Sequence, residues 1–217
     1  MDKKRQNIII RIFRRAMKLP KGFSLREATI EDIDSIMTVK EACSYKEDVK
    51  RIESGEKSKG FILGSTREKY LYYIQNAHVY MFMDEEKVAG FNVILPKKIA
   101  LEGSTMTETI KLSNQDGVNG TVEDYIYYDQ YCLHPDWANR TLAFSMIVIL
   151  SKMFYDRGVI NVYGSVVTEP IDNENSRKVL EGVGMKNVGT LDEEYGEIGS
   201  IKSVLYWINS KQWFDLL

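Results

Sequence analysis

The sequence contains few of the residues from which metal centres and hydrolytic triads are built. Its 217 residues include 2 cysteines and 2 histidines, which are Cys43, Cys132, His78 and His134. Their spacing does not match that of zinc ligands, and a Ser-His-Asp triad has little histidine to draw on. We therefore expect neither a metal site nor a hydrolase. Cysteines this rare and this far apart are typical of reduced thiols, so we expect a cytoplasmic protein.

Long apolar runs and a strong excess of charge are also missing. No apolar run approaches the roughly 18 residues that a membrane-spanning helix needs. The formal net charge is −2 at pH 7, which predicts no general attraction for nucleic acid, so that a polyanionic ligand would need a local site. The length suits one domain with a modest extension, and we expect an extension at residues 1–21 followed by a domain at residues 22–217.

The extension has the pattern of a basic amphipathic helix. Its apolar residues fall on one side of a helical wheel and its basic residues fall opposite, namely Ile9, Ile12, Phe13 and Ala16 against Arg11, Arg14, Arg15 and Lys18. It has no cleavage site of the kind that ends a secretory signal. We expect this helix to pack on the domain or on a second subunit of a homodimer. A weak contact with a membrane surface or with a partner protein is the alternative.

From residue 23 onward, helical and strand periods alternate. We expect strands near Leu25 and at 77–83, 88–95, 125–133, 159–167, 187–191 and 200–209, with a tight turn at 84–87. Helices are expected at 32–42, after Ser65, at 141–157 and from Asn173, with a charged, exposed segment at 47–59. Residues 97–123 predict a long loop with one short strand near 109–112. This order predicts an α/β (α+β) fold, with a mixed, mostly antiparallel sheet of six to seven strands flanked by helices.

The last expected helix has a defined start and a defined end. Asn173 can accept a backbone N–H as the N-cap, and Gly184 supplies the left-handed residue that closes the last turn. Ser176 and Leu180 fall on one face of this helix, four residues apart. By itself this pattern predicts a capped helix and nothing more.

The same spacing resembles the fourth-helix signature of the GNAT N-acetyltransferase superfamily, Asn-x-x-Ala/Ser-x-x-x-Tyr/Leu-x-x-x-Gly-Phe, with Met185 in place of Phe. Two more segments, 23–37 and 125–143, resemble the opening and central parts of that family and follow in its order. The resemblance covers about residues 23–209. It implies the GNAT fold, acetyl-CoA as co-substrate, and transfer of an acetyl or other acyl group to a primary amine of a small molecule or peptide. It also places the loop at 97–123 near the acceptor.

The resemblance also implies where coenzyme A binds. In the family, backbone atoms at the end of the fourth strand contact pantetheine, and the turn into the next helix holds the pyrophosphate with its free N–H groups. The residues at matching positions are Cys132, Leu133, His134, Ala138, Asn139, Arg140, Thr141, Leu142, Ala143, Asn173 and Ser176. The family's turn is Arg/Gln-x-x-Gly-x-Gly/Ala, and the turn from Ala138 to Ala143 matches it only at the last position, with Thr141 where the family has glycine. Threonine can still cap the helix or bond a phosphate.

Two residues of the fourth strand are candidates for catalysis. Asp129 lies among aromatic residues, where desolvation would raise its pKa and suit it to act as a general base, although a purely structural carboxylate is the alternative. The family's thiolate-protonating Tyr is replaced by Leu180. Tyr128 and Tyr131 fall on opposite faces by the two-residue period of a strand, and we take Tyr131 as the candidate acid, with Tyr128 or solvent as alternatives. We expect Cys132 to be structural and not a nucleophile.

The departures at Thr141 and Leu180 leave a second functional hypothesis open. A chain that has lost the glycine and the tyrosine of its family could be a non-catalytic acyl-CoA-binding or regulatory module. Acyl transfer is the function that the sequence favours.

Overall fold

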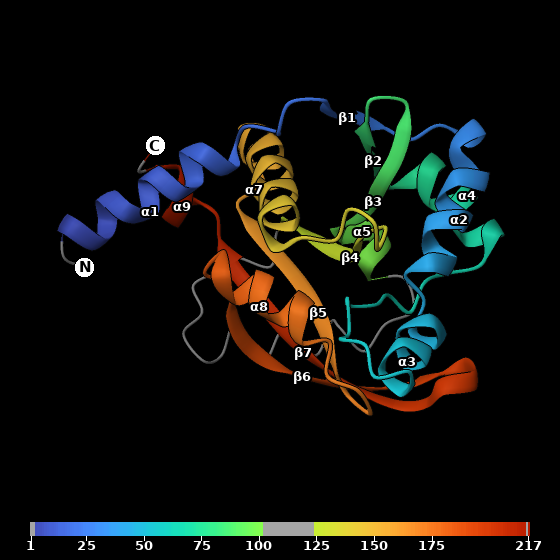
Figure 1. Cartoon of the computed structure of the whole chain (residues 1–217). Coiled ribbons are helices and arrows are strands. Elements are labelled where there is room, and N and C mark those ends of the chain that lie inside the picture. The colour runs from blue at the N-terminus through green and yellow to red at the C-terminus, as the bar shows by residue number, and fades with distance from the viewer. Residues whose placement is uncertain (1–2, 102–123, 216) are drawn as a thin grey trace.

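The computed structural model describes residues 3–101, 124–215 and 217, which form one seven-stranded sheet with helices on both faces (Figure 1). The strand order is β1-β2-β3-β4-β5-β7-β6. The strands are β1 Phe23–Glu27, β2 His78–Asp84, β3 Lys87–Pro96, β4 Tyr125–Leu133, β5 Asn161–Glu169, β6 Lys186–Tyr195 and β7 Gly199–Asn209. The helices are α1 Lys3–Ala16, α2 Ile33–Ala42, α3 Tyr45–Glu53, α4 Arg67–Asn76, α5 Lys97–Ala100, α7 Arg140–Asp156, α8 Glu174–Gly182 and α9 Lys211–Phe214.

Neighbouring strands of the sheet are antiparallel, except for β4 and β5, which are parallel. The parallel ladder runs only from Tyr125 opposite Asn161 to Tyr128 opposite Gly164. Both strands continue for several residues beyond it, so they part in the middle of the sheet. The predicted fold class is confirmed, and the interruption of the ladder is the feature that makes room for a site.

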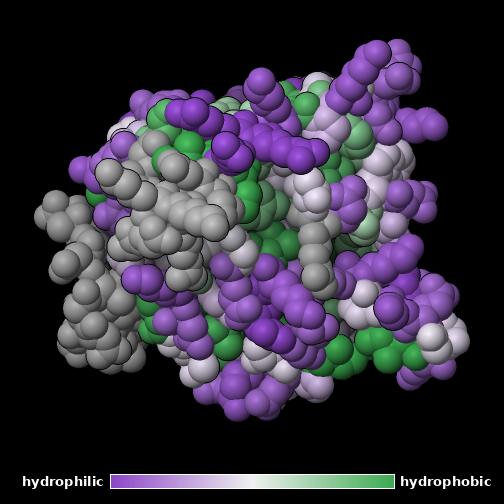
Figure 2. All heavy atoms as spheres, turned by 60° about the vertical axis from the view of Figure 1, so that its left-hand side comes forward, coloured by the Kyte–Doolittle hydropathy of each residue, from purple (hydrophilic) through white to green (hydrophobic). Residues whose placement is uncertain are grey.

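Two apolar layers hold the helices to the sheet. On one face α2 and α4 bury Ile36 and Tyr70 against β2 and β3. On the other face α7 and α8 bury Ile147 and Leu180 against β4, β5 and β7. A central sheet covered on both sides removes most of its apolar side chains from water, which is the main favourable term in folding. The surface turned forward in Figure 2 is largely hydrophilic, with hydrophobic side chains visible inside a central hollow.

The expected boundaries of helix α8 are confirmed. The Asn173 side chain accepts the N–H of Ser176 at 3.4 Å. Gly184 has a φ of 86°, and the amides of Gly184 and Met185 donate to the carbonyls of Glu181 and Leu180. These two bonds form a Schellman motif, which satisfies carbonyls that the end of a helix would leave unpaired.

The segment at 47–59 is largely exposed, as its charges predicted, but it also contains a helix and one buried carboxylate. It contains helix α3, which begins after Ser44, whose hydroxyl accepts the N–H of Glu47 at 3.3 Å. Asp48 in this helix is buried, because it accepts hydrogen bonds from the segment that follows. Of the loop predicted at 97–123, residues 97–100 form α5. Residues 102–123, including the strand expected near 109–112, lie outside the described residues.

Helix α1 forms as predicted and packs on the domain through the end nearer β1. The Phe13 ring lies 5.6 Å from that of Phe144 in α7 and 5.3 Å from that of Trp213 in α9. Ala16 is buried as well, but Ile12 is 49% exposed, so the predicted apolar face is wrong at that position. The side chain of Ile9 lies outside the described part of the structure. No helix of the described residues is both long enough and apolar enough to cross a membrane.

Candidate active site

Two adjoining cavities lie where β4 parts from β5. The first has a volume of about 260 Å³ and the second about 250 Å³. Their linings share Phe61, Ile62, Tyr131 and Ser176. The cavities therefore meet at the side chains of Tyr131 and Ser176, which come from β4 and α8.

A β-bulge in β4 sets which side chains face the cavities. Val93 of β3 pairs with Gln130 and Ile94 pairs with Tyr128, so Asp129 has no opposite residue. The additional residue shifts the alternation of side chains by one position. Tyr128 and Tyr131 consequently pack against the same apolar cluster, and the prediction that they lie on opposite faces is wrong. A strand period of two cannot reveal a bulge, because the bulge depends on the register with β3.

Asp129 lies at the second cavity and is held by a short chain of hydrogen bonds. The Tyr70 hydroxyl donates to Gln130 Oε1 at 2.6 Å, and Gln130 Nε2 donates to Asp129 Oδ2 at 3.0 Å. The same Nε2 donates to Ser65 Oγ at 3.2 Å. The pKa of Asp129 is raised to about 6, mainly by burial, with Gln130 and Lys69 opposing the rise and Glu193 adding to it. The raised pKa that the sequence led us to expect is present, and burial is its main cause.

Tyr131 is also enclosed. Burial raises the pKa of its hydroxyl to about 12, and a hydrogen bond with the side chain of Ser176 opposes that rise. The hydroxyl is therefore protonated at neutral pH and can donate a proton at the junction of the two cavities. The Tyr128 hydroxyl is less suited to donate a proton to a ligand, because it already forms hydrogen bonds with the carbonyl of Ile147 and with Ser151 Oγ, each at 3.2 Å.

No protein-family model matches this sequence, and no curated protein matches it by sequence. The structure, in contrast, resembles many solved acetyltransferases. A GNAT-family acetyltransferase from Streptococcus agalactiae superposes with a TM-score of 0.58 at 13% identity, over 87% of this chain and 96% of that one. The ribosomal-protein-S18-alanine N-acetyltransferase from Escherichia coli gives 0.57 at 9% identity, over 86% and 93%. The chain has the fold of the GNAT superfamily.

Another structure with this fold contains a nucleotide co-substrate. It is a protein from Salmonella typhimurium with its cofactor acetyl-CoA, which superposes with a TM-score of 0.53 at 9% identity, over 87% of this chain and 94% of that one. At such identities the likeness concerns the GNAT fold. The roles of individual residues in this chain have to be argued from its own geometry.

The first cavity contains about half of the residues that the sequence placed beside coenzyme A. Its lining includes Cys132, Leu133, Ala138, Asn139, Ala143 and Ser176. Asn173 lines the second cavity instead, where its amide donates to the carbonyl of Phe61 at 2.6 Å. His134 lies beside the turn, with Nδ1 accepting the N–H of Asp136 at 3.3 Å and its ring against that of Trp137.

The turn into α7 is capped by Asn139 and not by Thr141. Asn139 Oδ1 accepts the N–H of Leu142 at 2.8 Å, and the helix begins at Arg140. Thr141 is exposed in the first turn, whereas the Leu142 side chain is buried among Phe82, Ala89 and Met146, so that only its backbone is available to a ligand. The Arg140 side chain lies outside the described part of the structure. Asn139 is the N-cap because its backbone is extended, with φ −146° and ψ 148°, and its side-chain oxygen reaches the N–H of Leu142, whereas Thr141 already lies inside the helix.

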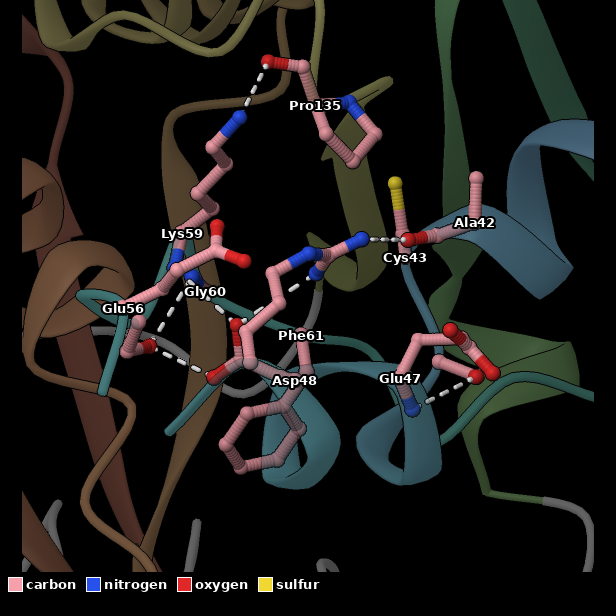
Figure 3. Close-up of polar contacts among 12 residues, drawn as sticks. Ala42, Cys43, Glu47, Asp48, Glu56, Lys59, Gly60, Phe61 and Pro135 are labelled. Atoms are coloured by element: carbon pink, nitrogen blue, oxygen red, sulfur yellow. Dashed lines mark hydrogen bonds and ion pairs between the residues drawn. The ribbon is translucent and has the colours of Figure 1, made fainter. Parts of the chain in front are cut away.

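Sequence reasoning missed the segment at 58–62, which lines both cavities. Asp48 Oδ2 accepts from Ser58 Oγ at 2.6 Å, and Oδ1 accepts the N–H of Lys59 at 3.0 Å (Figure 3). The side chain of Lys59 extends across the first cavity to the carbonyl of Pro135 at 3.4 Å. Asn175 Nδ2 donates to the carbonyl of Ser58 at 2.8 Å. The one sequence signal was the Gly60 to Ser65 stretch, which interrupts the helical pattern before α4.

Leu180 and Cys132 are both buried, and neither offers a reactive group to the site. Leu180 is 2% exposed in the apolar layer beneath α8, so no polar group replaces the family's tyrosine at that position. Cys132 and Cys43 both line the first cavity, and burial followed by contact with Cys43 raises the pKa of Cys132 well above its usual value. A thiol that stays protonated at neutral pH is a poor nucleophile.

Among the described residues, no three His, Cys, Asp or Glu side chains gather closely enough to hold a metal ion.

Proposed function

We propose that the protein transfers an acetyl or other acyl group from coenzyme A to a primary amine. The observation that carries the proposal is the meeting of two cavities at Tyr131, where β4 and β5 part within a GNAT fold. One cavity can hold the thioester and the other the amine, so the reacting atoms can meet at the junction. Holding two reactants together in this way supplies a large part of a transfer enzyme's rate.

The first cavity has the chemistry to hold coenzyme A. The edge of β4 beyond Tyr128 has no ladder partner in β5, so its backbone N–H and C=O groups can pair with the amides of pantetheine. The N-terminus of α7 offers free N–H groups for the pyrophosphate, and Lys59 adds a positive charge at the cavity wall. Coenzyme A supplies the thioester whose acyl group is transferred.

The second cavity supplies the base. Asp129, with a pKa of about 6, is ionised at neutral pH and still basic enough to accept the proton that the amine loses as its nitrogen bonds the acyl carbon. As the carbon–sulfur bond breaks, Tyr131 donates a proton to the leaving sulfur. The Asp129 proton then passes to solvent and Tyr131 regains one, which restores both groups.

The test measures thiol release from acetyl-CoA across a panel of small and peptide amines, beside a thermal-shift titration with coenzyme A. Native-state binding at 100 times Kd stabilises a protein by about 2.7 kcal/mol, so coenzyme A should raise the Tm. Thr141→Glu should abolish this shift, because it places a negative charge at the N-terminus of α7, and Thr141→Val is the neutral control. No shift at millimolar ligand contradicts the proposal.

The same experiment distinguishes acyl transfer from the second functional hypothesis. The exposed threonine in the turn and the buried Leu180 favour a non-catalytic acyl-CoA-binding module. That hypothesis requires a coenzyme A shift without turnover of any amine. Turnover of one amine, lost in Asp129→Asn with the shift retained, excludes it.

A further inference from the structure

The second cavity has an unusual balance of charge. Asp129 and Glu193 are the charged residues of its lining, and no lysine, arginine or histidine among the described residues lines it. The nearest basic influence on Asp129 is Lys69, which does not line the cavity and whose Nζ lies over the rings of Tyr72 and Tyr73, 4.9 and 5.0 Å from their centroids. A cavity with two carboxylates and no cation of its own favours a ligand that carries positive charge.

Glu193 faces this cavity because of the alternation of β6. Leu191, Glu193 and Tyr195 share the inner face of this edge strand, and Leu191 is buried in the core. Asp192 and Glu194 point outward and are exposed. Burial raises the pKa of Glu193, and no ion pair joins it to a basic side chain of the described residues. A partly buried carboxylate without a counter-charge is costly, and a cationic ligand group would remove that cost.

Aromatic side chains form fixed walls between the two carboxylates. The hydroxyls of Tyr127 and Ser165 are hydrogen-bonded at 2.6 Å, and the Tyr195 hydroxyl donates to the carbonyl of Gly64. Tyr73 closes the cavity from α4. Rings held in this way can line the path of a methylene chain or a cation without a further loss of side-chain entropy. Asp129 and Glu193 also lie close enough for each to act on the same neighbouring phenol, Tyr195.

We propose that the acceptor is a small diamine that is doubly protonated in solution. Its reacting nitrogen releases one proton to solvent and then lies at Asp129 as the free amine, its second nitrogen stays cationic at Glu193, and the short apolar chain between them follows the tyrosine walls. This inference rests on the proposed function and adds the class of acceptor. An amine without a second charge leaves Glu193 uncompensated in the complex. An amine with a terminal carboxylate is repelled by it.

The test uses three acceptors of the same length, 1,4-diaminobutane, butylamine and 4-aminobutyrate, with acetyl-CoA and the full chain. The end of the molecule away from the reacting amine carries a positive charge in the diamine, no charge in butylamine and a negative charge in 4-aminobutyrate. We expect kcat/KM for the diamine to exceed that for butylamine roughly tenfold or more, the range measured for charge pairs at interfaces. 4-Aminobutyrate should be the poorest acceptor.

Glu193→Gln should reduce the ratio of diamine to butylamine roughly tenfold, and Glu194→Gln, on the exposed face of the same strand, should leave that ratio unchanged. Comparing ratios between variants cancels the different basicities of the two amines. A ratio that is the same in the wild type and in Glu193→Gln overturns the inference while the proposed function stands.

If no amine is acetylated, the proposed function fails. Calorimetry can then still test whether the second cavity prefers a diamine, by measuring the affinity for each amine directly. The wild type saturated with coenzyme A should bind 1,4-diaminobutane more tightly than butylamine, and Glu193→Gln should lose that preference. Equal binding of the two amines by the wild type overturns the inference. A preference for a lysine-containing peptide over the diamine also overturns it, because the acceptor would then be a macromolecule.

Discussion

The carboxylate of Asp129 lies where ionisation is unfavourable, and this is the source of its basic strength. It belongs to the bulge of β4, is enclosed at the second cavity, and receives one hydrogen bond from Gln130 at Oδ2. A carboxylate in water has a pKa near 4 and is a weak base at neutral pH. Burial narrows the gap between its pKa and neutral pH, and it also lowers the stability of the folded protein.

Asp129→Asn should therefore reduce activity and increase stability. The pKa rises from 3.8 unfolded to about 6 folded, so between about pH 4 and 6 the folded state binds a proton that the unfolded state does not. The free energy of unfolding accordingly falls as the pH rises through that range. The variant should be more stable than the wild type by about 2 to 3 kcal/mol at pH 8, with the difference vanishing near pH 4.

Activity gives the second readout for this variant. At pH 7, kcat/KM should fall about 10²- to 10⁴-fold, and in the wild type it should decline below about pH 6 as the base becomes protonated. Denaturant unfolding and pH–rate profiles measure the two effects. A variant that is less stable at pH 8 and retains the wild-type pH profile would show that Asp129 is a structural carboxylate.

Tyr131 and Tyr128 lie on one face of the sheet and offer a matched pair of substitutions. Tyr131→Phe removes the hydroxyl at the junction of the cavities and should lower kcat about 10²-fold with the coenzyme A shift retained. Tyr128→Phe removes a hydroxyl bonded to Ile147 and Ser151 and should cost about 1 kcal/mol of stability without loss of activity per folded molecule. Equal kcat values in the two variants would mean that solvent protonates the thiolate.

At the scale of elements, α3 and the segment at 58–62 form a unit joined through Asp48. This carboxylate is 1% exposed, bonds the Ser58 hydroxyl and the Lys59 amide, and lies 3.5 Å from Arg51 Nη1. Arg51 Nη2 in turn donates to the carbonyl of Ala42 at 2.8 Å. One buried residue thereby fixes the wall of the first cavity to α2 and α3.

Asp48→Ala should cost about 3 to 5 kcal/mol, because it removes the counter-charge of Arg51 and the acceptor of the Ser58 and Lys59 hydrogen bonds. In the folded fraction, the KM for acetyl-CoA should rise more than the KM for the amine, since Ser58, Lys59 and Gly60 line only the first cavity. Glu47→Ala, which removes a surface ion pair with Lys50, should cost about 0 to 1 kcal/mol and change neither KM. Equal rises in both KM values would contradict this role.

At the scale of the whole molecule, α1 and the C-terminal helix close one end of the α7 layer. Arg14 Nη2 donates to the carbonyl oxygen of Leu217 at 3.1 Å, and Phe13 lies between Phe144 and Trp213. The first and last described elements thus contact each other and cover the same helix. This packing accounts for the burial of Phe13 without a second subunit or a membrane.

Phe13→Ala should lower the free energy of unfolding by about 3 to 5 kcal/mol, as for other buried aromatic residues. Ile12→Ala, at an exposed neighbouring position, should change it by less than about 0.5 kcal/mol. The full-length protein should not sediment with anionic vesicles. Vesicle binding that needs Ile12 and weakens with salt would instead favour the membrane-surface alternative. The homodimer and the boundary at residue 21 stay predictions.

Local patterns determined most elements of this protein. The helix from Asn173 to Gly184 and the strand from Tyr125 to Leu133 could be predicted from the sequence, because caps and periodicity depend on neighbouring residues along the chain. Helix α3 has a local cap at Ser44, but the role of Asp48 could not be predicted in the same way, because this residue becomes a buried acceptor only when Ser58 and Lys59 fold over it.

The candidate site depended on contacts between distant segments. The sequence identified Asp129, Tyr131 and the strand end near Cys132, whose chemistry and position in β4 are local properties. Only the tertiary structure decided that Asp129 lies in a bulge, since this depends on its register with β3. The structure also brought Glu193 of the edge strand to the same cavity. The distance between residues along the chain does not reveal which of them meet in the site. Their meeting depends on the order of strands in the sheet and on where the parallel ladder between β4 and β5 stops.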